Sequence, residues 1–126
     1  MKTQAVDMSN EISTELGTIT IAEELLATLA GYAAIECYGL VGMSSRKLKD
    51  GISELLGRDS LRKGVTIKLE EDQLIVDLYI VVSYGTRIPQ VAQNVMEKVK
   101  YTLENITGLQ VSQVNVNIQG VQVVNR

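Results

Sequence analysis

The sequence contains no histidine, tryptophan or phenylalanine, and only one cysteine, among its 126 residues. Without histidine there is no imidazole base for a Ser/His/Asp or Cys/His pair, and no histidine ligand for zinc or haem. A single cysteine excludes an intrachain disulfide, a CxxC redox pair and an all-cysteine metal site. No spacing assembles the remaining Asp, Glu, Lys, Tyr and Cys side chains into a catalytic pair. We therefore expect no enzymatic activity and no cofactor or metal.

Positive charge is also scarce, because 12 Lys and Arg residues face 15 Asp and Glu residues, for a net charge of −3. A protein that mainly neutralises phosphate backbones needs a surplus of cations, so nucleic acid is not an expected partner. The charge is unevenly distributed, since residues 46–63 hold six basic and three acidic side chains. We hypothesise that this basic segment contacts an acidic partner or an anionic membrane surface. Its basic residues are Arg46, Lys47, Lys49, Arg58, Arg62 and Lys63.

Long hydrophobic runs are missing, and none approaches the roughly 20 residues that span a bilayer. Residues 1–10 carry one basic side chain, Lys2, and no hydrophobic run, so we expect no signal peptide there. An unpaired cysteine fits a reducing compartment. Together these features predict a cytoplasmic protein, peripheral at the membrane only through a partner.

Hydrophobic periodicity predicts a single domain over residues 15–126, after a disordered or loosely ordered tail over residues 1–14. The expected class is α+β, with a small mixed sheet of three to four strands, two main helices and one short mobile helix in the order β-α-α-β-β-α-β. The last strand and the one before it along the chain are joined through a helix, so they are candidates for parallel neighbours. The expected strands cover residues 18–21, 65–70, 73–84 and 113–119, and the expected helices cover residues 22–37, 48–56 and 88–106.

The strand over residues 73–84 is apolar on one face and half apolar on the other. We expect Leu74, Val76, Leu78, Ile80, Val82 and Tyr84 to point into the core. The opposite face mixes aromatic and branched apolar side chains with uncharged polar ones, as interface cores do. We hypothesise that it is a self-association surface of a homo-oligomer, unless helices cover it within one chain. Its residues are Thr66, Ile75, Tyr79, Val81, Asn115 and Asn117.

Three separated motifs carry a family resemblance. They are Gly39-Leu40-Val41-Gly42-Met43 after Ala33-Ala34, Tyr84-Gly85-Thr86-Arg87-Ile88-Pro89 after Val76-Asp77-Leu78, and Thr107-Gly108-Leu109-Gln110-Val111 before Val114-Asn115-Val116. With these motifs, residues 17–123 resemble the alkaline shock protein family of Gram-positive bacteria, also called envelope stress response proteins. The resemblance implies a non-enzymatic cytoplasmic protein of envelope homeostasis that self-assembles and is recruited to the membrane by an anchor protein. It also implies that some small members work beside a kinase of the dihydroxyacetone or fatty-acid type.

The alternative function is a KH-like RNA-binding module. In that fold a GxxG loop joins two helices and clamps the nucleic-acid backbone, and Gly39-Leu40-Val41-Gly42 lies between two expected helices. The basic segment just beyond this loop favours the alternative. Against it, Leu40 and Val41 supply neither charge nor side-chain donors, and a helix stop followed by a tight turn explains the same residues.

Three further features have simple structural explanations. The run Glu70-Glu71-Asp72 is typical of a charged hairpin turn rather than a metal site. Cys37 is expected to be an inert apolar residue, since its sequence neighbour Glu36 would not lower a thiol pKa. Arg87 follows a strand and precedes a helix, a position where anions bind, although strand exit and helix entry explain it more simply.

Overall fold

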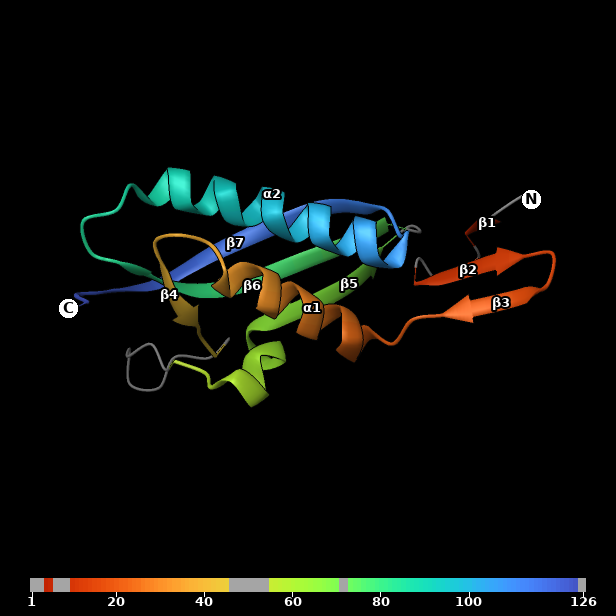
Figure 1. The fold of residues 1–126 in the computed structure, drawn as a ribbon, viewed down its shortest axis with the longest axis horizontal. Helices are drawn as coiled ribbons and strands as arrows, with labels where there is room; N and C mark the ends of the chain where they lie inside the picture. The colour runs from red at the N-terminus through yellow and green to blue at the C-terminus, as the bar shows by residue number, and fades with distance from the viewer. Residues whose placement is uncertain (1–3, 6–9, 46–54, 71–72, 125–126) are drawn as a thin grey trace.

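The computed structural model describes residues 4–5, 10–45, 55–70 and 73–124. Two α-helices and one 3-10 helix accompany strands that form two separate sheets, which confirms the α+β class (Figure 1). In chain order the elements are β1 (Gln4–Ala5), β2 (Glu11–Thr14), β3 (Gly17–Thr20), α1 (Glu23–Ile35), β4 (Leu40–Met43), η1 (Arg58–Gly64), β5 (Val65–Glu70), β6 (Gln73–Ser83), α2 (Ile88–Thr107) and β7 (Val111–Gln122).

The central strand of the main sheet is β6. It pairs along one edge with β7 in parallel, which confirms the predicted neighbours. Along its other edge it pairs antiparallel with β5 at residues 73–78 and with β4 at residues 80–82. Because both edges are paired, β6 is buried on nearly its whole length, and the alternate residues expected in the core are fully buried up to Val82. Tyr84 is the exception: the strand ends at Ser83 and this side chain is 73% exposed, so the prediction that it lies in the core is wrong.

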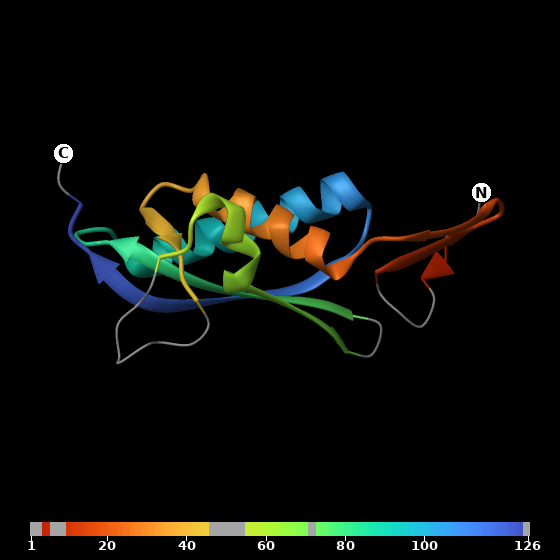
Figure 2. The same cartoon turned by 90° about the horizontal axis from the view of Figure 1, so that it is seen from below.

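The two long helices cover one face of the main sheet and leave the other face open among the described elements (Figure 2). Helix α2 begins with Pro89 in its first turn, where the missing N–H costs nothing, and ends at Gly108 in the left-handed conformation. Its buried stripe recurs every four residues, as the sequence predicts: Val91, Val95, Val99 and Leu103. Helix α1 packs against both α2 and η1, and Gly31 lies against Leu61 of η1.

A β-arm extends from one end of the body (Figure 1). Strands β1, β2 and β3 form an antiparallel sheet of their own, and residues 11–14, which the sequence places in a loose tail, form β2. The arm is anchored at its base, where the backbone N–H of Ile21 and the side-chain amide of Asn10 each donate a hydrogen bond across it. Ile12 packs against the main core. All four residues of β3 are exposed.

The segment after α1 differs from the sequence-based expectation. Leu40–Met43 is strand β4 rather than a turn, because its backbone pairs with β6. The short helix expected over residues 48–56 lies mostly outside the described residues. Its last two apolar residues are described and are not helical: Leu55 forms an isolated bridge with Ser44, and the Leu56 N–H donates to the Met43 carbonyl.

Candidate functional surfaces

The open face of the main sheet brings together all six residues predicted for self-association. In the strand register, Thr66 of β5 lies opposite Asp77 of β6, while Asn115 and Asn117 of β7 lie opposite Asp77 and Tyr79. Cross-strand partners share a face of the sheet, and Ile75 and Val81 lie two residues on either side of these positions in β6. The strand register therefore places these residues on one face of the sheet, as the two-residue period predicts.

The six residues differ in exposure. Asn115 and Asn117 are exposed and Tyr79 and Thr66 are partly exposed. Ile75 and Val81 are buried, with 8% and 1% of their surfaces exposed, because neighbouring strands flank the central one. Four of the six can therefore offer surface to another molecule. The exposed neighbour Gln113, which lies opposite Ile75, extends the face. We call this surface, with Thr66, Tyr79, Gln113, Asn115 and Asn117, the open sheet face.

A buried carboxylate lies at the centre of the open sheet face, and sequence reasoning did not single it out. Asp77 is 6% exposed, and its Oδ2 lies 3.0 Å from Nζ of Lys68. The side-chain amide of Asn115 donates to its Oδ1 at 2.8 Å. The hydrogen bond to Asp77 raises the pKa of Lys68, so the ammonium stays charged. The pair cancels its own charge, and the signal for it was an acid in an otherwise apolar strand with a lysine in the preceding hairpin strand.

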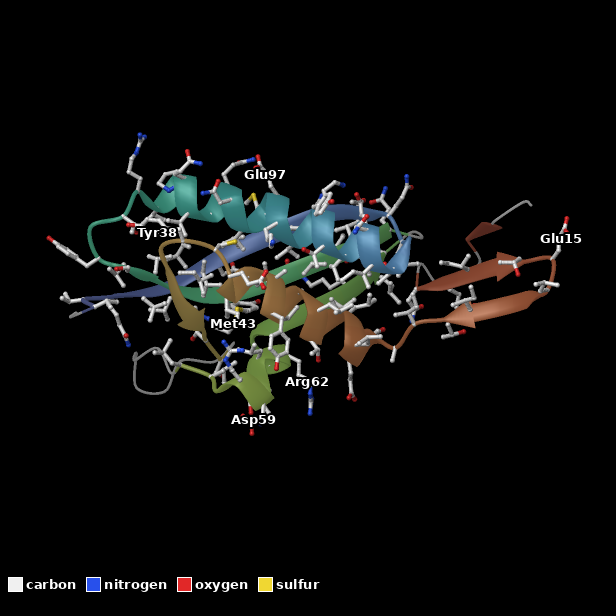
Figure 3. The ribbon with its side chains drawn as sticks, in the orientation of Figure 1. Glu15, Tyr38, Met43, Asp59, Arg62 and Glu97 are labelled. Atoms are coloured by element: carbon white, nitrogen blue, oxygen red, sulfur yellow. The ribbon has the colours of Figure 1, made fainter. Side chains whose placement is uncertain are left out.

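The described basic residues of the segment 46–63 lie on η1. Arg58, Arg62 and Lys63 are exposed, and Figure 3 shows Arg62 pointing away from the body. Arg62 and Lys63 line a groove that Glu23 and Glu24 of α1 also line, so its charge is mixed rather than purely positive. The other three predicted contact residues, Arg46, Lys47 and Lys49, lie outside the described residues.

A second hollow lies at the end of the body opposite the arm, where Figure 3 labels Tyr38. It measures about 290 Å³ and joins two of the motifs that the sequence singled out, residues 39–43 and 84–89. Sequence reasoning did not place them together, because they approach through the pairing of β4 with β6. The lining residues are Tyr38, Gly39, Leu40, Val41, Ser83, Thr86 and Val124, and we call this hollow the end pocket. Arg87 follows Thr86 directly. It is exposed and is the last residue before α2.

The described part of the chain holds no cluster of three or more His, Cys, Asp or Glu side chains suited to a metal ion. Burial raises the pKa of the Cys37 thiol, which makes the thiolate less available at neutral pH. The KH-like alternative loses its main feature, because Leu40–Met43 is a paired strand and not a loop that joins two helices. No helix within the described ranges is long and apolar enough to cross a membrane.

The fold and surfaces thus define a small α+β domain that presents an open sheet face, a projecting β-arm and a pocket at the end opposite the arm. Residues 11–123 match the alkaline shock protein 23 family, which is described as having a cell envelope-related function, and the chain belongs to this family. The three sequence motifs predicted the same family.

Three relatives illustrate the similarity. The chain is 48% identical over 119 residues to the uncharacterized protein YloU of Bacillus subtilis (strain 168), covering 94% of this chain and 99% of that one. It is 35% identical over 122 residues to the uncharacterized protein YqhY of the same organism, covering 97% and 90%. It is 25% identical over 118 residues to a stress response regulator gls24 homolog of Streptococcus pyogenes serotype M3, covering 94% of this chain and 64% of that one. No solved structure matches the chain.

Proposed function

We propose that this protein is a non-enzymatic assembly and adaptor protein of cell-envelope homeostasis, which acts by self-association and by recruiting a partner. The family's envelope-related description and the stress response regulator among the relatives support the envelope part. A membrane-anchor protein or a neighbouring kinase-type protein are the proposed partner classes. Peripheral membrane location would then come through the partner.

The observation that carries self-association is the open sheet face. It holds a partly exposed tyrosine among uncharged amides and hydroxyls, which is typical of interface cores. The charged residues near its centre, Lys68 and Asp77, are paired with each other at 3.0 Å. A second copy that applies the same face therefore meets a compensated charge pair at the centre, and such a contact closes as a symmetric dimer.

Recruitment of a partner is supported by the exposed cations Arg58, Arg62 and Lys63 on η1. An acidic surface would bind them through charge, with an affinity that falls as salt screens the attraction. Glu23 and Glu24 line the groove beside Arg62 and Lys63, so their negative charge would repel an acidic partner that entered this groove.

The self-association surface is tested by Tyr79→Asp and, separately, by Gln113→Arg. Each places an extra charge on the open sheet face, so each should shift the protein toward monomer in light scattering after size exclusion. Gln113 is exposed, so its substitution leaves folding intact even if Tyr79→Asp does not. Tyr101→Asp is the matched control, because Tyr101 is 68% exposed on α2, outside the sheet. Unchanged mass in folded Gln113→Arg protein would contradict the proposed face.

A further inference from the structure

The tip of the β-arm presents a single leucine to solvent. Glu15 and Leu16 form the two-residue turn between β2 and β3, and Thr14 pairs with Gly17 across it. The Thr14 hydroxyl donates to the Gly17 carbonyl at 3.1 Å and accepts the Leu16 N–H at 3.1 Å. The turn is thus held by its own hydrogen bonds. Leu16 is 93% exposed, the highest value among the large hydrophobic side chains of the described residues.

The end pocket offers a site with aliphatic side chains in its wall. Leu40, Val41 and Val124 supply branched aliphatic side chains to a hollow of about 290 Å³, which Ser83 and Thr86 also line. The hollow has room for one branched aliphatic side chain. Tyr38, which also lines the pocket, is 81% exposed and adds an aromatic ring to its wall. Water in such a site is released when an apolar side chain enters, which favours binding.

The arm tip and the end pocket lie at opposite ends of the long axis of the molecule, as the labelled Glu15 and Tyr38 show (Figure 3). The arm of one chain therefore does not reach the pocket of the same chain in this structure. Charge favours a meeting between two chains. Glu15 adjoins Leu16, Arg87 adjoins Thr86 of the pocket wall, and neither forms an ion pair within the described residues.

We propose that Leu16 at the arm tip of one copy inserts into the end pocket of a second copy, with Glu15 facing Arg87. This inference rests on the proposed function of self-association but uses a different surface from the open sheet face. The contact joins two different patches, so it is head-to-tail and leaves one arm and one pocket unused at the ends. Repetition produces a linear chain of copies.

The test uses two variants that each lose one half of the contact. Leu16→Ser removes the apolar tip, and Val124→Asp places a charge in the pocket at a residue that is 49% exposed and outside the core. Both are made in the Gln113→Arg background, so that the open sheet face does not contribute. Alone, each variant should associate more weakly than the Gln113→Arg protein, with the dissociation constant raised roughly tenfold or more. Mixed at equal amounts, they should form a 1:1 dimer and nothing larger, because the arm of one still fits the pocket of the other.

The matched control is Leu25→Ser, since Leu25 is also an exposed leucine, at 50%, but lies on α1. It should leave association unchanged. Circular dichroism checks that each variant is folded. The arm-and-pocket contact would be overturned if folded Leu16→Ser protein associated as strongly as the Gln113→Arg protein, or if the mixture stayed monomeric. Either result would leave the proposed function in place. A wild-type protein that is monomeric at every concentration would overturn both.

Discussion

At the scale of single residues, Gly39 shows how a glycine positions the end pocket. Its φ of +89° lies in the left-handed region that residues with a Cβ rarely adopt. A methyl group added there would lie 2.7 Å from Cγ2 of Val91 on α2, closer than atoms can pack. Gly39 therefore allows the chain leaving α1 to pass against α2 before β4 begins.

Replacement of Gly39 by alanine should destabilise the protein by about 2–4 kcal/mol, from backbone strain plus steric overlap. Gly85 is the matched control. It has a similar φ of +93° but nothing within 4 Å of the added methyl, so Gly85→Ala should cost only about 1 kcal/mol. Urea unfolding measures both free energies. An equal loss of unfolding free energy in the two variants would show that Val91 moves aside without loss of stability.

The sequence pattern predicts which residues share the open sheet face but not how exposed each of them is. The two-residue period placed Tyr79 and Asn117 on one face correctly, because that period is a property of the strand itself. The same period did not distinguish Tyr79, which is partly exposed, from Val81, which is 1% exposed. Exposure depends on which strands flank the residue, and that information lies in distant parts of the chain.

At the scale of elements, the end of α2 is tied to the start of β7 by two side chains. Glu104 accepts the backbone N–H of Val111 at 2.9 Å, and Lys100 donates to the Val111 carbonyl at 2.6 Å. Lys100 and Glu104 also form an i,i+4 ion pair at 3.2 Å. Both polar groups of the first β7 residue are thereby satisfied, and the strand enters the sheet beside Leu74.

The Glu104 carboxylate should make stability depend on pH. Its hydrogen bond from Val111, helped by Lys100, lowers the pKa of Glu104 below the ordinary 4.5. The resulting stabilisation is present above that ordinary value and is lost as the pH falls through the lowered, folded-state pKa. Glu104→Gln should thus cost about 1 kcal/mol at pH 7 and much less near pH 3.

Urea unfolding at the two pH values measures this effect. Glu97→Gln is the control, since Glu97 lies on the same helix and accepts a hydrogen bond of 3.1 Å from the exposed side chain of Gln93, one turn away. The control should show little change at either pH. A pH-independent loss in Glu104→Gln would mean that packing, and not the carboxylate charge, links α2 to β7.

Most elements of the main sheet could be predicted from sequence because their signals are local. Helix α2 has Pro89, a four-residue apolar stripe and Gly108, and the β5–β6 hairpin has clear alternation. Strand β4 was missed because its four residues include Gly42, and because a short strand is defined by its partner, β6, and not by its own propensity. Strand β2 was missed for a similar reason: its alternation is weak, and pairing with β3 decides its structure.

At the scale of the whole molecule, the two proposed contacts differ in symmetry. A contact between two open sheet faces uses the same patch twice and closes as a dimer, whereas the arm and the end pocket are different patches and leave open ends. A molecule with both contacts therefore joins dimers into assemblies without a fixed size. The sheet-face contact alone gives dimers, and the arm-and-pocket contact alone gives linear chains of copies. Mass as a function of concentration therefore distinguishes the two contacts.

Light scattering over a range of concentrations should show unlimited growth for the wild-type chain. Leu16→Ser should reach a plateau at twice the chain mass of 13.8 kDa, because only the closed sheet-face contact remains. Gln113→Arg should grow in steps of one chain through the head-to-tail contact, and the double variant should stay monomeric. Association of the folded double variant would require a third surface. The first to examine is the outer edge of β7, which pairs with no other described strand.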